Sequence, residues 1–201
     1  MITVAKKSPD HHALYHLAEQ QAGYFTARQA AGAGFSWERL TGYSKNGRFQ
    51  RVAHGVYRLA QFPSSRFEDL FVAWLKCGSK SAISHESALA LYELSDVLPG
   101  EVHVTVPRTA SRRRKGIRLH TNRLMPSSVV NREGLPVTSV PRTIVDVAKA
   151  GLSEDHVARA IQEALERGLT TNQALIAEAS RRGGRAARLI KSYANSSKGH
   201  S

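Results

Sequence analysis

Apolar residues in the first sixty positions recur at the three- and four-residue spacing of helices. The first helical segment lies between residues 9 and 23, and its apolar face is made of Ala13, Leu14, Leu17 and Ala18. A second helix begins at Thr26, because Thr26 and Gln29 have the spacing of a capping box, in which each side chain accepts a hydrogen bond from the other residue's backbone amide. A third begins at Ser36, after a glycine-rich turn.

The pattern then changes to the alternation of a β-hairpin. Residues 48–52 and 56–59 read as strands, and Gly55 in the connection can adopt a positive φ. This order of helices and hairpin is that of a winged helix-turn-helix, in which the third helix lies in the major groove of DNA. We therefore predict such a domain over residues 1–62.

Basic and polar side chains of this domain are the candidate DNA contacts. Arginine and lysine on the third helix can read guanine edges, and threonine can contact a thymine methyl group or a phosphate. Cations of the hairpin position the domain through phosphates. The predicted contacts are Arg28, Arg39, Thr41, Lys45, Arg48, Arg51, His54 and Arg58. The alternatives are a small helical subdomain with a solvated basic face and a winged helix used for protein contact.

After a polar break at residues 63–65, the pattern mixes helices with short strands. Alternation over residues 102–106 and 116–121 predicts two strands that can pair, and amphipathic stripes predict helices before and after them. We therefore expect an α+β chain, with a mostly helical domain and a small antiparallel sheet over residues 63–194. Residues 195–201 are expected to form a flexible tail.

Four adjacent cations lie between the two predicted strands. They are Arg112, Arg113, Arg114 and Lys115, and such a run repels itself unless an anion or solvent screens it. The turn is therefore a candidate for additional phosphate contacts, with a solvated loop as the alternative.

The overall charge favours a polyanionic partner. The 201 residues include 29 Lys and Arg against 16 Asp and Glu, a formal net charge of +13. No apolar run is long enough to span a membrane, no secretory signal is visible at the N-terminus, and Cys77 is the single cysteine. We expect a cytoplasmic protein without disulfides and without membrane association.

The sequence motifs of common enzymes are missing. The chain has no HExxH, P-loop or GxSxG motif, and no acidic residue two positions before a lysine, as a metal-dependent nuclease would normally have. His12 and His16 lie one helical turn apart without a third ligand nearby in the sequence. Glu86, beside His85, is most simply explained by the dipole of a helix that begins there. We therefore expect no enzyme, no cofactor and no bound metal.

Four sequence stretches resemble a known family. Residues 25–31 (FTARQAA) and 47–58 (GRFQRVAHGVYR) resemble the N-terminal winged helix-turn-helix of the AbiEi antitoxins, which belong to type IV toxin–antitoxin systems of bacterial abortive infection. Residues 82–89 (AISHESAL) and 136–143 (PVTSVPRT) look like stretches of the family's C-terminal antitoxin domain. The resemblance covers about residues 10–170.

The resemblance implies two activities and no catalytic residue. The N-terminal domain would bind inverted repeats of operator DNA and repress its own operon, as a monomer or weak dimer that pairs on the DNA. The C-terminal domain would neutralise a cognate nucleotidyltransferase-like toxin. Two other hypotheses stay open: a winged-helix transcription factor whose C-terminal part binds a ligand or partner, and a non-catalytic nucleic-acid-binding subunit of a nuclease.

Overall fold

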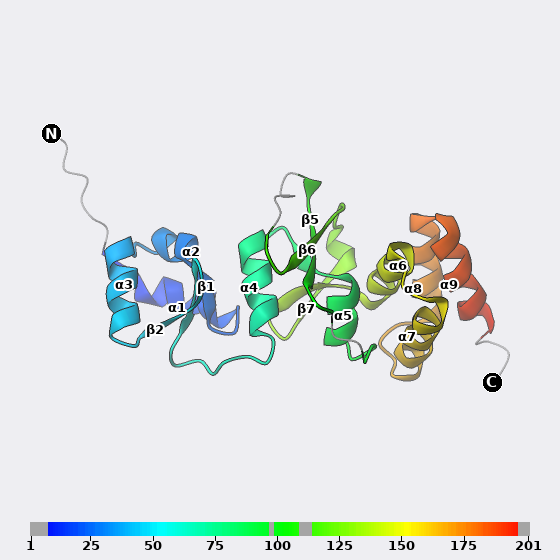
Figure 1. Cartoon of the computed structure of the whole chain (residues 1–201), viewed down its shortest axis with the longest axis horizontal. Helices are drawn as coiled ribbons and strands as arrows, with labels where there is room; N and C mark the ends of the chain where they lie inside the picture. The colour runs from blue at the N-terminus through cyan, green and yellow to red at the C-terminus, as the bar shows by residue number, and fades with distance from the viewer. Residues whose placement is uncertain (1–7, 97–98, 109–113, 197–201) are drawn as a thin grey trace. The chain divides into compact units, whose positions relative to one another are not determined.

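The computed structural model describes residues 8–96, 99–108 and 114–196, which divide into two compact units (Figure 1). The first unit runs to Ser79 and also includes residues 133–135; the second holds residues 80–132 and those from Pro136 onward. The boundary expected after residue 62 therefore falls inside the first unit.

The first unit is a winged helix-turn-helix, as predicted. Helices and strands follow in the order α1 (His11–Glu19), β1 (Tyr24–Thr26), α2 (Ala27–Gly32), α3 (Trp37–Lys45), β2 (Phe49–Ala53), β3 (Val56–Leu59) and α4 (Glu68–Cys77). The three strands form an antiparallel sheet in the order β1-β3-β2. Its core is apolar and aromatic and consists of Leu14, Ala18, Phe25, Ala30, Phe35, Leu40, Phe49, Tyr57 and Leu59.

Helix α4 belongs to this unit because it packs on β1 and β3. The ring of Phe71 stacks on Tyr24, with centroids 4.8 Å apart, and the Tyr24 hydroxyl donates to Glu68 Oε2 at 2.9 Å. The polar break at residues 63–65 thus separates two elements of one folding unit, and Tyr24 joins them.

The second unit combines a sheet with a group of helices. Its elements are β4 (Ala82–Ile83), α5 (His85–Leu91), β5 (Val102–Val106), β6 (Ile117–Thr121), a short 3₁₀ turn (Pro126–Ser128), β7 (Val129–Arg132), β8 (Leu135–Thr138, whose first residue is grouped with the first unit), α6 (Val140–Ala150), α7 (Glu154–Glu166), α8 (Asn172–Arg182) and α9 (Gly184–Ser196). Helix α9 extends into the segment expected as a tail.

The sheet of the second unit is mixed, with the order β6-β5-β4-β8-β7. The α+β class is confirmed, but the antiparallel pairing expected for this sheet is found for β4 with β5, whereas β5 pairs with β6, and β4 with β8, in parallel. A tight hairpin would have made β5 and β6 antiparallel. Instead, the first residue of β6, Ile117, lies opposite the first residue of β5, Val102.

Candidate nucleic-acid interface

Helices α2 and α3 form a helix-turn-helix whose geometry is fixed by local hydrogen bonds. The hydroxyl of Thr26 accepts from the backbone N–H of Gln29 at 3.1 Å, and Gln29 Oε1 accepts from the backbone N–H of Thr26 at 2.7 Å, so the predicted capping box is confirmed. In the turn, Gly34 has φ +83°, and a Cβ there would lie 2.9 Å from the Ser8 carbonyl oxygen. Ser36 then caps α3, as predicted.

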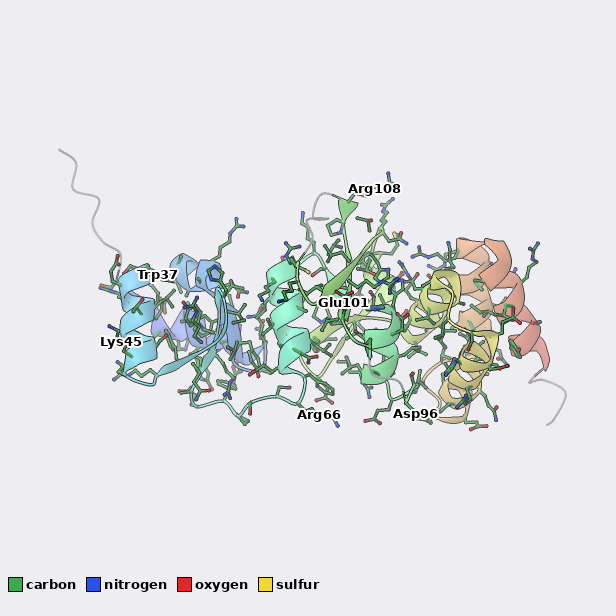
Figure 2. All side chains as sticks on the ribbon, viewed as in Figure 1. Trp37, Lys45, Arg66, Asp96, Glu101 and Arg108 are labelled. Atoms are coloured by element: carbon green, nitrogen blue, oxygen red, sulfur yellow. The ribbon has the colours of Figure 1, made fainter. Side chains whose placement is uncertain are left out.

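Helix α3 turns one side to the core and another to the solvent. Leu40 is buried in the aromatic core, and the ring of Tyr43 stacks on Phe49 at 5.0 Å. Trp37 and Lys45 are exposed and mark the two ends of the helix (Figure 2). Trp37 is 60% exposed, and our sequence-based prediction of DNA contacts omitted it. An exposed tryptophan at the N-terminal end of this helix lies where recognition helices contact base edges.

The other predicted contacts on α3 are partly buried. Arg39 is half-buried, and its Nη1 atom has no hydrogen-bond partner among the described residues. Thr41 donates its hydroxyl hydrogen to the carbonyl oxygen of Trp37 at 3.0 Å, which leaves the hydroxyl oxygen able to accept. Glu38 lies in the first turn, where its negative charge interacts favourably with the positive end of the helix dipole. It also adds one negative charge to the exposed side of α3.

The β2–β3 hairpin carries exposed cations beside α3. The guanidinium of Arg48 lies 5.5 Å from the centre of the Tyr43 ring, which orients it next to the end of α3. At the tip, Arg51 Nη2 lies 3.2 Å from His54 Nδ1, and both side chains are exposed. Gly55 has φ +71°, as the turn requires. Arg28, on α2, is exposed as well.

Arg58 differs from the other predicted contacts because it is buried within the unit. It is 8% exposed, and its guanidinium donates to the carbonyl oxygen of Phe62 and to the side-chain oxygen of Gln50. A strand residue was expected to point outward here, but β3 is the central strand of its sheet, and all four of its residues are buried. Arg58 therefore ties the hairpin to the segment after β3, and we remove it from the set of phosphate contacts.

This position predicts a stability effect for Arg58. Replacing Arg58 by Ala leaves the Phe62 carbonyl and the Gln50 amide without their buried donor, so we expect a loss of about 1.5–3 kcal/mol of unfolding free energy. Urea unfolding followed by tryptophan fluorescence measures it. Arg51→Ala, on the exposed tip of the same hairpin, is the matched control and should change stability by less than about 0.5 kcal/mol. Equal losses in the two variants would contradict the structural role of Arg58.

The arginine-rich turn is only partly described by the structure. Arg112 and Arg113 lie outside the described residues. Arg114 forms an isolated bridge with Ile117, and Lys115 is exposed just before β6. The described part of the run belongs to the second unit, whereas α3 and the hairpin belong to the first.

The remaining sequence candidates concern metals and membranes. His12 and His16 do come together, with their Nε2 atoms 3.0 Å apart. Within residues 8–96, 99–108 and 114–196, no group of three or more histidine, cysteine or acidic side chains is arranged to hold a metal ion. None of the helices in these ranges has the length and apolar character of a membrane span.

The match to a known protein family lies within the first unit. Residues 12–60 match the profile of a family described as "Transcriptional regulator, AbiEi antitoxin". The match agrees with the winged helix-turn-helix fold of that unit. No curated protein matches the chain. The crystal structure of the RV2827C protein from Mycobacterium tuberculosis is similar, with a TM-score of 0.54 over 92% of this chain and 75% of that one. At 14% identity, this likeness is one of fold alone.

Proposed function

We propose, with the antitoxin-regulator match of residues 12–60 as the premise, that this chain is a DNA-binding antitoxin that represses its own operon. The observation that carries the proposal is the exposed, cationic surface formed by α3 and the β2–β3 hairpin on a winged helix-turn-helix. In this fold the third helix fits the major groove, and the hairpin lies against the neighbouring phosphates.

The proposed contacts divide by what they can recognise. Arg39, Thr41 and Lys45 lie on α3 and would reach base edges or the adjacent phosphates. Arg48, Arg51 and His54 of the hairpin, with Arg28 of α2, would hold phosphates and set the orientation of the domain. The binding site would be an inverted repeat occupied by two copies that are monomers or weak dimers in solution.

The second unit would act by binding and without catalysis. In this proposal it contacts a cognate nucleotidyltransferase-like toxin in the cytoplasm and neutralises it, while the cationic run at residues 112–115 adds phosphate contacts. Co-expression with the product of the adjacent gene, followed by size-exclusion chromatography, tests the toxin part. A stable complex and restored growth support it; if the neighbouring product neither elutes with this chain nor inhibits growth, the antitoxin assignment is wrong.

Salt dependence tests the DNA-binding part quantitatively. For a promoter duplex, the logarithm of affinity should fall steeply against the logarithm of salt concentration. The Arg48→Gln/Arg51→Gln variant should reduce that slope by about two, at about 0.9 for each phosphate that the protein no longer neutralises. Affinity should fall for all sequences alike, because these residues contact the backbone. Fluorescence-anisotropy titration at several salt concentrations measures both quantities.

The control for this titration removes the same charge elsewhere. Arg159→Gln/Arg188→Gln takes two exposed arginines from α7 and α9 of the second unit and should leave the slope unchanged. If the two double variants change the slope equally, binding follows net charge, and the proposed interface is wrong.

A further inference from the structure

Three histidines and one glutamate meet in the second unit, far in sequence from the proposed DNA contacts. We call His85, Glu86, His103 and His120 the histidine cluster. The rings of His85 and His120 are stacked, with centroids 3.4 Å apart and planes at 12°. His103 Nδ1 lies 2.5 Å from Glu86 Oε2 and 3.4 Å from His120 Nε2. The cluster joins the start of α5 to the adjacent strands β5 and β6.

The strand register explains why these side chains meet. Strands β5 and β6 pair in parallel, with His103 opposite Arg118 and Thr105 opposite His120. Alternate residues share one face of a sheet, so these four polar side chains lie on the same face. His103 and Thr105 are buried, His120 is half-buried, and Arg118 is exposed on β6, an edge strand. On this face of the sheet, the side chains of β5 are therefore buried, and Arg118 of β6 places a cation at the surface.

The position of His85 is maintained at a cost to local stability. His85 has φ +51°, a left-handed conformation that is unfavourable for residues other than glycine and that tends to occur at functional sites. Ser84 is the N-cap of α5, but its side chain makes no capping hydrogen bond. Instead, its hydroxyl accepts from Thr105 at 2.8 Å and lies 3.0 Å from His85 Nδ1. The local structure therefore orients the imidazole at the expense of the helix cap.

Burial decides the protonation of the cluster. Ser84 is fully buried, and its hydroxyl, which accepts from Thr105, either donates to His85 Nδ1 or accepts from it, according to the tautomer of the ring. Burial, with the neighbouring charges of His120 and His103, lowers the pKa of His85 to about 3, and burial lowers the pKa of His120 to about 4. Both rings are therefore neutral at pH 7.

A buried donor lies on the helix that packs against α5. Arg142, on α6, is completely buried, and its Nε donates to Asp146 Oδ2 at 2.6 Å, but its Nη2 has no hydrogen-bond partner among the described residues. Helix α6 packs against α5, the helix that begins at His85, and the charge of Arg142 contributes to the lowered pKa of His85. A buried donor without an acceptor is costly, and such groups call for an oxygen acceptor in the same region.

The chemistry of the cluster favours an anion over a metal ion. Parallel stacked imidazoles cannot both direct a lone pair at one ion, and the single carboxylate of the cluster is paired with His103. The groups around it, Arg118 and Arg142, are cationic donors suited to phosphate oxygens. We propose that the histidine cluster, together with Arg142 of the adjacent helix α6 and with Arg118 as the outermost contact, binds a phosphate group, either free phosphate or that of a small phosphate monoester. This site stands independently of the proposed DNA binding.

Histidine NMR on the full chain tests the site. With ¹³C-labelled histidine at pH 7, inorganic phosphate and adenosine monophosphate are titrated separately, against sodium chloride of equal ionic strength. We expect saturable shifts of the ring signals of His85, His103 and His120, and none of His156, which is exposed on α7. Tighter binding of phosphate identifies a free-anion site, and tighter binding of the nucleotide identifies a monoester site; each supports the proposal.

Matched variants locate the binding. His120→Gln and Arg118→Gln should each weaken phosphate binding by roughly tenfold, as expected for loss of one charge-assisted hydrogen bond, while Arg159→Gln and His156→Gln should not. Because Arg118 is exposed, its variant provides the test even if His120→Gln unfolds. The proposal is overturned if phosphate causes no saturable shift, if Arg159→Gln weakens binding as much as Arg118→Gln, or if Zn²⁺ moves the three signals and phosphate does not.

Discussion

Replacing Arg142 by Ala is expected to destabilise the second unit by about 3–5 kcal/mol, the cost of leaving one partner of a buried ion pair without the other. Arg142 is completely buried, and Asp146 is nearly so, with 2.6 Å between Nε and Oδ2. Burial already raises the pKa of the Asp146 carboxyl, and the arginine is the main group that keeps it charged. Urea unfolding followed by circular dichroism of the helices measures the loss.

Two further variants test this explanation of the Arg142 effect. Arg142→Met with Asp146→Leu removes both charges and fills the space, so it should recover most of the lost stability. Arg167→Ala breaks a pair with Glu163 at 3.0 Å on the surface of the same unit and should cost about 1 kcal/mol or less. If Arg142→Ala lowers the unfolding free energy no more than Arg167→Ala does, the buried ion pair does not stabilise the second unit.

Lowering the pH from 7 to 4.5 is expected to destabilise the second unit by on the order of 2–3 kcal/mol through His85 alone. Its pKa is about 3 in the folded chain and near 6.5 when unfolded, so below pH 6.5 the unfolded state binds a proton that the folded state does not. Stability is therefore full above pH 6.5 and falls as the pH approaches 3. His120, with a pKa of about 4, acts in the same direction with a smaller effect, because it is partly exposed.

Two carboxyl groups of the second unit, Glu86 in the cluster and Asp146 on α6, modify this pH dependence. Burial raises the pKa of Glu86, but the His103 hydrogen bond, a backbone hydrogen bond and the charges of His103 and His85 together lower it to about 2, so Glu86 adds to the loss only below about pH 4.5. Burial raises the pKa of Asp146, so protonation of Asp146 works in the opposite direction. Protonation of Asp146 thus opposes part of the loss that the histidines cause.

The measurement is urea unfolding at pH 7, 5.5 and 4.5, compared between variants. His85→Asn should flatten the dependence by up to about 1.4 kcal/mol per pH unit, the value for one proton. Asparagine suits the left-handed backbone at this position. His156→Asn, on the surface, should keep the wild-type dependence. An unchanged pH dependence in His85→Asn would show that His85 is not the group responsible.

Local signals allowed the helix-turn-helix and hairpin to be predicted. The capping box of Thr26 and Gln29 and the cap at Ser36 depend on residues three apart, and the structure contains both. Strand β1 was missed because its three residues form a strand only through pairing with β3. The boundary at residue 62 was likewise a local signal, whereas the packing of α4 on Tyr24 depends on residues more than forty positions apart.

The histidine cluster could not be assembled from the sequence in the same way. His85 and Glu86 do lie at a helix start, as the sequence indicates, but the helix dipole does not explain why the Ser84 side chain leaves its capping position. His103 and Thr105 alternate on a strand, which predicts a shared face. Their proximity to His120 depends on the parallel register of β5 and β6, which pairs Thr105 with His120. The spacing of Arg142 and Asp146 on one helix was the available signal for a buried pair.

The grouping of residues 133–135 with the first unit has a consequence for synthesis of the chain. Leu135 is completely buried, and a Cβ at Gly134 would lie within 3.5 Å of the Phe71 ring. The first unit therefore cannot complete its packing when residue 79 leaves the ribosome. Its packing is completed only when residues 133–135 have been translated, several seconds later at about 5–20 residues per second. The first unit should therefore be incompletely packed in a nascent chain halted before residue 133. The same holds for the product of a gene fragment ending at residue 79.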